Sequence, residues 1–115
     1  MGGNSKMRNV RVEVNGYKFA SRAEARRYSE LIFLRDHGSI KDLQLHPKFS
    51  LAILNQEITT YTADFQYSIF DQSFGNWITI VEDVKGRRAG PAYEMFKVKK
   101  RLMKALHGID VQEYP

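Results

Sequence analysis

Two stretches, Tyr61-Thr-Ala-Asp64-Phe-Gln-Tyr67 and Ile78-Thr-Ile-Val-Glu-Asp83-Val-Lys85-Gly86, decide the expected fold of this chain. Both are rich in β-branched and aromatic residues, which predicts two β-strands. Side chains alternate between the faces of a strand, so Asp83 and Lys85 project from the same face. If the two strands pair as neighbours, Asp64 joins them there.

Two carboxylates and an ammonium on an otherwise apolar sheet face need a physical explanation. Removing charges from water is costly unless they pair with each other or with a cation. Asp64, Asp83 and Lys85 therefore indicate a metal site, with the lysine available for chemistry. A partly buried structural salt bridge is the alternative. Glu82 lies on the opposite face, where we expect it to pair with a basic side chain at the surface.

Length and composition limit the class of protein. The chain has 115 residues, enough for one domain with a modest core. It contains no cysteine, which excludes disulfides, zinc–thiolate sites and cysteine nucleophiles. No run approaches the roughly 18 apolar residues of a membrane span, so we expect a cytoplasmic protein. Residues 1–9 are polar and basic, and we expect a flexible arm there.

Positive charge is concentrated behind the second strand. From Lys85 to Lys104 there are eight basic residues and one acid, Glu94, within a chain of net charge +5. A solvated helix face is one explanation, and a track for phosphates is the other. The candidate contacts to a nucleic-acid backbone come from this segment and from the first helix: Arg22, Arg26, Arg27, Arg87, Arg88, Tyr93, Lys97, Lys100, Arg101 and Lys104.

Turn and capping signals place the remaining elements. Asn15-Gly16 predicts a type I′ turn between strands at residues 10–14 and 17–19. A capping box at Ser21 to Glu24 starts a helix expected over residues 22–37. One or two strand pieces follow over residues 40–53, broken at Pro47. A second helix runs from the Gly90-Pro91 pair to Gly108, and a last strand is expected over residues 109–114.

This order resembles a known group of enzymes. The motifs that carry the resemblance are Val12-Glu-Val-Asn-Gly-Tyr-Lys-Phe19, Ser21-Arg-Ala-Glu-Ala-Arg-Arg-Tyr28, His46-Pro-Lys-Phe49, Tyr61-Thr-Ala-Asp-Phe65 and Val81-Glu-Asp-Val-Lys-Gly86. They are similar to a family of small phage and prophage proteins, catalogued as a domain of unknown function and assigned to the PD-(D/E)xK nuclease superfamily. The resemblance implies a restriction-endonuclease-like core of order αβββαβ over residues 10–115, with an N-terminal β-hairpin and a mixed sheet flanked by helices.

The resemblance also implies roles for single residues. Asp64 stands at the metal-binding aspartate, and Asp83 and Lys85 stand at the acid and the lysine of the (D/E)xK pair. Glu24 matches a first-helix glutamate found in some branches of the superfamily. Together they form the implied catalytic set.

Phosphodiester hydrolysis requires a cation, an activated water and a stabilised leaving oxygen. Hard oxygen ligands without thiolates suit Mg²⁺, with Mn²⁺ as a substitute. Asp64, Asp83 and the Val84 carbonyl are the predicted ligands, with Glu24 as a further one. Lys85 would orient or deprotonate the attacking water.

Two residues keep alternative roles. Glu24 shares the apolar stripe of its helix with Tyr28 and Leu31, which directs it towards the sheet and the metal site. It could instead only cap the helix. His46 could contact substrate, act as a base in the pocket, or be an ordinary edge residue.

We therefore expect a Mg²⁺-dependent DNA endonuclease in the cytoplasm of a bacterial host, acting in phage replication, recombination or packaging. A homodimer would supply a second basic surface. The alternative is a catalytically silent module that binds DNA or recognises its structure, or a subunit of a larger phage DNA-processing complex.

Overall fold

The computed structural model describes residues 11–115 as an α/β fold. The elements are β1 (Val12–Val14), β2 (Tyr17–Phe19), α1 (Arg22–Asp36), β3 (Ile40–Leu45), β4 (Lys48–Ile53), β5 (Gln56–Thr62), β6 (Phe65–Asp71), β7 (Asn76–Val84), α2 (Pro91–His107) and β8 (Gln112–Tyr114). The predicted N-terminal hairpin is confirmed, and Asn15 and Gly16 both have positive φ at its turn. The arm predicted for residues 1–9 lies outside the described range.

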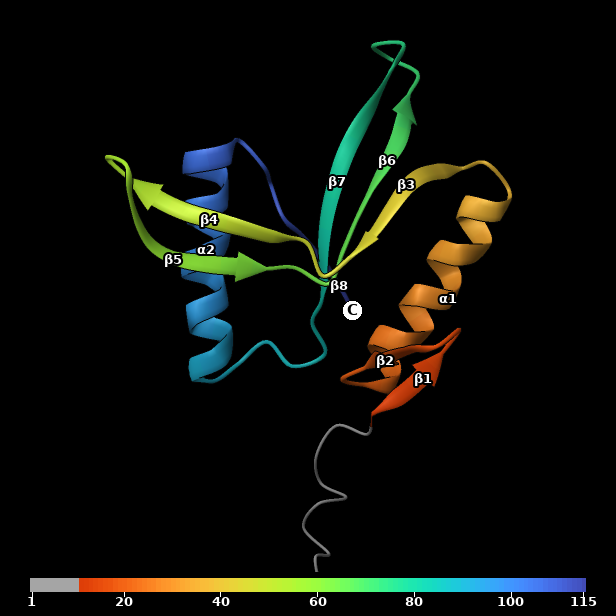
Figure 1. Ribbon diagram of the computed structural model, residues 1–115, viewed down its shortest axis with the longest axis horizontal. Coiled ribbons are helices and arrows are strands. Elements are labelled where there is room, and N and C mark those ends of the chain that lie inside the picture. Colours follow the sequence, from red (N-terminus) through yellow and green to blue (C-terminus); the bar gives the residue numbers. More distant parts are fainter. Residues whose placement is uncertain (1–10) are drawn as a thin grey trace, which may run out of the picture.

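The central sheet has the strand order β3-β6-β7-β8. Strands β3 and β7 run antiparallel to β6, whereas β8 runs parallel to β7, so the sheet is mixed. Figure 1 shows α1 with hairpin β1–β2 on one side of these strands and α2 with hairpin β4–β5 on the other. The predicted α/β class, with a mixed sheet flanked by helices, is confirmed. Neither helix within residues 11–115 is long and apolar enough to cross a lipid bilayer.

Helix α1 begins where the capping signal predicts. The Ser21 hydroxyl oxygen accepts a hydrogen bond from the Glu24 amide at 3.1 Å, which satisfies one of the free donors of the first turn. The helix ends one residue before the predicted His37. Its buried face packs on β2, β3 and β6 in the first core cluster, which contains Phe19, Ala25, Tyr28, Leu31, Ile40, Phe65 and Tyr67.

Helix α2 covers the other face of the sheet. It starts at Pro91 and stops before Gly108, which has the left-handed φ of 69° that favours glycine. Its buried residues join a second core cluster: Leu51, Tyr61, Ala63, Val81, Phe96, Met103 and Val111. Phe65 of the first cluster is paired with Glu82, the neighbour of Val81, so the two clusters lie on opposite faces.

The sequence predicts one strand over the stretch from Tyr61 to Tyr67, but the structure does not form one. It divides at Ala63 and Asp64 into the end of β5 and the start of β6. Strand β5 pairs with β4 in a separate two-stranded sheet that the sequence does not predict. The turn between them has positive φ at Leu54 and Asn55, 51° and 67°. Leucine rarely adopts a positive φ. The turn also lacks the Asn-Gly pair that usually marks such a hairpin, so the sequence does not predict it.

Hairpin β4–β5 leaves the central sheet and returns to it at one point. The His46 amide donates to the Asp64 carbonyl, and the Ala63 amide donates to the Pro47 carbonyl, both at 3.0 Å. His46 has a positive φ of 51°, which turns the chain out of β3. The two connections meet at the centre of Figure 1. Asp64 therefore lies at a bend held by the backbone of a distant segment.

Glu82 faces α1, as its position in the alternation predicts, and it is only 2% exposed. Arg27 donates to both of its carboxylate oxygens, at 2.7 and 2.9 Å, and the Tyr67 hydroxyl donates at 2.5 Å. The Arg27 guanidinium also lies 3.7 Å from the centre of the Tyr114 ring. The sequence predicts Arg27 as a DNA contact, but its side chain belongs to this interior ion pair. The expected surface partner for Glu82 is therefore wrong, because its partner is largely buried.

We predict that Arg27→Met destabilises the protein by about 3–5 kcal/mol, because it leaves the Glu82 carboxylate buried without its cation. Chemical denaturation measures the loss. Arg26→Met is the matched control, since Arg26 is exposed on the same helix, and it should change stability by less than about 0.5 kcal/mol. Glu82→Gln added to Arg27→Met should restore part of the loss. A loss no larger than that of the control would contradict the assignment.

Candidate functional site

The side chains of Asp64 and Asp83 each accept a hydrogen bond from the backbone of the other's segment. The Asp64 amide donates to Asp83 Oδ1 at 2.8 Å, and the Val84 amide donates to Asp64 Oδ2 at 2.7 Å. These two bonds attach the β5–β6 bend to the last residues of β7. The predicted meeting of Asp64 and Asp83 is therefore found, although the bend rather than a continuous strand produces it. Val84, whose carbonyl is a predicted ligand, contributes its amide to the same contact.

Asp83 is 3% exposed and lies on the α2 face of the sheet. The Tyr61 hydroxyl donates a hydrogen bond to Asp83 Oδ2. Lys85 Nζ lies 3.9 Å from the same oxygen and 4.1 Å from the centre of the Phe96 ring. The alternation predicted for β7 thus places Asp83 and Lys85 on one face, with the ammonium held between a carboxylate and an aromatic ring.

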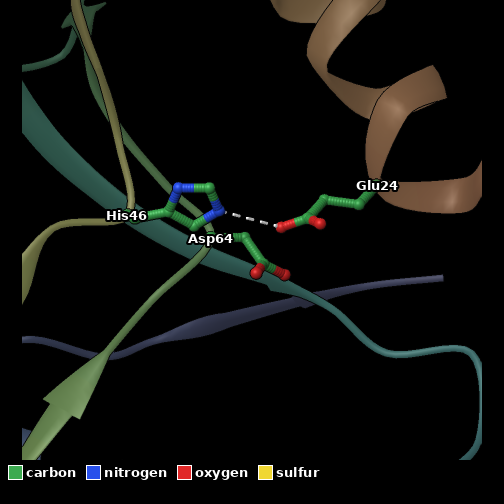
Figure 2. A group of neighbouring side chains, drawn as sticks. All are labelled: Glu24, His46 and Asp64. Atoms are coloured by element: carbon green, nitrogen blue, oxygen red, sulfur yellow. Dashed lines mark hydrogen bonds and ion pairs between the residues drawn. The ribbon is translucent and has the colours of Figure 1, made fainter. Parts of the chain in front are cut away.

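A second group of ligand atoms adjoins Asp64. Glu24, His46 and Asp64 each offer one such atom, all within 4.8 Å of one another. Figure 2 shows Glu24 reaching from α1 towards His46, with Asp64 beside them. Glu24 Oε2 lies 3.3 Å from His46 Nε2, while Oε1 accepts a hydrogen bond from the Ala20 amide at 2.9 Å. One oxygen of Glu24 therefore secures the start of the helix and the other faces the site.

Both aspartates are hard to ionise in the structure. Burial and the neighbouring Glu24 carboxylate, which favours a protonated Asp64, raise the pKa of Asp64 to about 6. Burial and the charge of Asp64 raise the pKa of Asp83 to about 7. The ammonium of Lys85 opposes the second shift but does not cancel it. A bound divalent cation would favour the charged form of both carboxylates, so the donor set fits such an ion.

The aspartates and Lys85 open to solvent through a pocket of about 390 Å³. Its lining comes from the end of β5, the end of β7 and the first half of α2: Thr60, Tyr61, Thr62, Asp64, Asp83, Lys85, Ala92, Met95, Phe96 and Lys99. Glu24 and His46 are not part of this lining. Asp64 is the residue that connects the pocket with the Glu24–His46 pair.

Several of the predicted basic residues on and before α2 line an open hollow or bond to an acidic side chain. Lys97, Lys100, Arg101 and Lys104 border one open hollow of about 340 Å³ together with Glu113. Lys97 pairs with the exposed Glu94 at 3.2 Å. Arg88, Tyr93 and Lys100 all bond to Glu113, whose role the sequence does not predict. Glu113 is paired with Asp83 across β7 and β8, and no local pattern in the sequence specifies this pairing.

The other predicted DNA contacts are exposed. Arg22 and Arg26 lie on the solvent side of α1, and Arg87 lies in the loop between β7 and α2. Arg87 also lines a hollow of about 330 Å³ with Lys85 and Tyr93. Apart from Arg27, the predicted set is therefore accessible to a ligand in solution.

Comparison with known proteins identifies one family. A family described as "Protein of unknown function (DUF1064)" matches residues 4–112. No curated protein and no solved structure matches the chain significantly. Because the match covers nearly the whole sequence, the chain belongs to the DUF1064 family.

Proposed function

We propose that this protein is a metal-dependent endonuclease that hydrolyses phosphodiester bonds of DNA. The observation that carries the proposal is the meeting of Asp64, Asp83 and Lys85 in one solvent-accessible pocket. Two carboxylates can hold a divalent cation, and an ammonium beside them can take part in proton transfer to or from a water that attacks a phosphate. Lys99 on the rim adds a positive charge where an anionic substrate would enter.

The order of elements supports membership of the PD-(D/E)xK superfamily. With hairpin β4–β5 set aside, the helices and the central sheet follow one another as α1, β3, β6, β7, α2 and β8. This is the αβββαβ order that the sequence resemblance implies. Asp64 directly precedes the second of these strands, Asp83 lies near the end of the third, and Lys85 directly follows the third.

Asp64 and Asp83 would hold the cation, with Glu24 and His46 next to Asp64 as further ligands or as acceptors for its waters. Bound Mg²⁺ or Mn²⁺ would neutralise phosphate charge and acidify a water. Lys85, kept near Asp83, would orient that water or receive its proton. The exposed basic residues of α1, α2 and the loop before α2 would position the DNA backbone without reading its sequence.

A second candidate function is a catalytically silent DNA-binding module, either alone or within a larger phage DNA-processing complex. One observation favours it: both oxygens of Asp83 already accept hydrogen bonds, from the Tyr61 hydroxyl and the Asp64 amide. A carboxylate so satisfied has less capacity left for a cation. The predictions below separate the two candidates.

We predict that Asp83→Asn abolishes nicking of supercoiled DNA in Mg²⁺ or Mn²⁺ while DNA binding is retained or strengthened. The substitution removes a ligand charge that also repels phosphate. Asp36→Asn is the control, because Asp36 is exposed at the end of α1 and its side chain pairs with the adjacent Arg35. Wild-type cleavage by Asp83→Asn would exclude the metal site, and absence of cleavage by the wild-type protein would favour the silent module.

Lys85 is predicted to affect turnover more than metal affinity. Lys85→Met should lower the cleavage rate by about 10²- to 10⁴-fold, the usual contribution of a positioned acid–base or electrostatic group. The Mn²⁺ affinity of the folded protein, measured by calorimetry, should change little. Lys18→Met, on the exposed side of β2, serves as the control. An unfolded Lys85→Met protein would instead assign Lys85 a structural role.

The raised pKa values of Asp64 and Asp83 predict how stability depends on pH. The folded protein binds these protons more tightly than the unfolded chain does. Their stabilising contribution is therefore complete below about pH 4 and is lost as the pH rises through about 6 and 7. In EDTA the unfolding temperature should fall between about pH 5 and about pH 8. The pKa of Glu113, lowered to about 2, acts below this range.

Mn²⁺ should reverse the decrease at about pH 8 and have little effect at about pH 5, where protons compete for the carboxylates. Asp64→Asn should flatten the pH profile in EDTA and remove the response to Mn²⁺. Differential scanning calorimetry measures both effects without any assay of cleavage. An Mn²⁺ response that survives in Asp64→Asn would place the ion elsewhere.

A further inference from the structure

Three hydrogen-bond donors converge on one carboxylate beside the proposed site. Lys100 Nζ lies 3.0 Å from Glu113 Oε2, and Arg88 Nε lies 3.1 Å from Oε1. The Tyr93 hydroxyl donates to Oε1 at 2.9 Å. Within residues 11–115, Arg88 and Lys100 form no ion pair with any other carboxylate. Two cations and a hydroxyl thus surround a single anionic group.

This cluster is next to the pocket. Glu113 is the partner of Asp83 in the parallel pairing of β7 and β8, so the two side chains project from the same face. Adjacent strands lie about 4.8 Å apart. A phosphate bound at the position of the Glu113 carboxylate would therefore lie beside a phosphate held by a cation on Asp83.

The surface on both sides of the cluster is open and basic. Tyr93 lines the hollow that contains Lys85 and Arg87, and Lys85 also lines the pocket of the proposed site. Glu113 and Lys100 line the hollow that contains the other basic residues of α2. A continuous series of cations therefore leads from the pocket through the cluster and along α2.

We infer that Arg88, Tyr93 and Lys100 form a binding site for one backbone phosphate of DNA, and that the Glu113 carboxylate takes the place of this phosphate in the free protein. The inference deepens the proposed function and rests on it for the nature of the ligand, but it does not require cleavage. On binding, the phosphate replaces the carboxylate, and the Glu113 side chain moves towards solvent.

The chemistry of the donors fits a phosphate. A phosphodiester has a single charge and two free oxygens, as a carboxylate does, and arginine with lysine and a hydroxyl is a common set of donors for it. The donors are within reach of solvent, because the side chains of Arg88 and Lys100 are 44% and 30% exposed. Burial acts to raise the pKa of Glu113, but hydrogen bonds from Lys100, Tyr93 and Arg88 lower it to about 2.

Glu113 then limits DNA affinity, and its neutral variant should bind DNA more tightly. The test uses a fluorescent duplex of roughly 20 base pairs, the full-length protein, EDTA to prevent cleavage, and a series of salt concentrations. Glu94→Gln is the matched control, because it removes one negative charge from the same basic surface, where Glu94 pairs with the exposed Lys97.

We expect Glu113→Gln to bind the duplex roughly tenfold more tightly than the wild-type protein, because a like charge no longer competes with the phosphate. Its log–log salt dependence should stay within about half a unit of the wild-type value, because the same phosphates are contacted in both complexes. Glu94→Gln should change the affinity by less than about threefold, as expected for an exposed charge.

A second substitution links the gain to the cluster. Lys100→Gln introduced into Glu113→Gln should remove most of the gain, whereas Lys97→Gln in the same background should not. If Glu113→Gln fails to fold, as checked by circular dichroism, the single variants decide: Lys100→Gln should weaken binding by the wild-type protein more than Lys97→Gln does.

Equal effects of Glu113→Gln and Glu94→Gln, or equal effects of the two lysine variants, would overturn the inference and leave Glu113 as a structural link between β8 and α2. Tighter binding by Glu113→Gln together with no cleavage by the wild-type protein would support the phosphate site and contradict the endonuclease. The two proposals therefore fail separately.

Discussion

Two hydrogen bonds from backbone amides to carboxylates, between Asp64 and the end of β7, are the constraint on which the rest of the site depends. Each carboxylate accepts a hydrogen bond from an amide of the other segment. Neither the bend at Asp64 nor the end of β7 can therefore shift alone. The same bend carries the Asp64 carbonyl that holds His46. Through these contacts one short segment sets the positions of side chains from β3, β6 and β7.

Two adjacent acids of β7 show how the fold treats charge differently on its two faces. Glu82 is neutralised by the two-point contact with Arg27 and by Tyr67, in the manner of a structural ion pair. Asp83 has only the more distant ammonium of Lys85 as a cation, and its pKa is raised to about 7. The charge of Glu82 is thus neutralised by groups of the protein itself. The charge of Asp83 is not neutralised in this way, which supports the metal proposed at this position.

The sequence predicts those features that depend on local signals. The turn at Asn15-Gly16, the cap at Ser21 and the helix end at Gly108 each follow from the conformation that one or two residues prefer. The alternation along β7 correctly separates Asp83 and Lys85 from Glu82. These features include Asp83 and Lys85, two of the residues on which the candidate site is built.

Features that depend on distant partners are not predictable in this way. The break at Ala63 and Asp64 has no glycine or proline to mark it, since it is held by the backbone of His46 and Pro47. The sequence alone indicates an exposed Arg27, because its ion-pair partner Glu82 lies on the distant strand β7. Glu113 acquires its importance from the parallel pairing of β8 with β7, which no local pattern specifies.

Hairpin β4–β5 begins and ends at segments that are bonded to each other, His46–Pro47 and Ala63–Asp64. The loop it forms is therefore closed at its base, independently of its own length. Since the entropy of closing a loop grows only slowly with length, residues can be added or removed near the exposed tip at Leu54 with little cost to the site. The base of the hairpin holds the candidate site in place, whereas the length of the hairpin itself can vary.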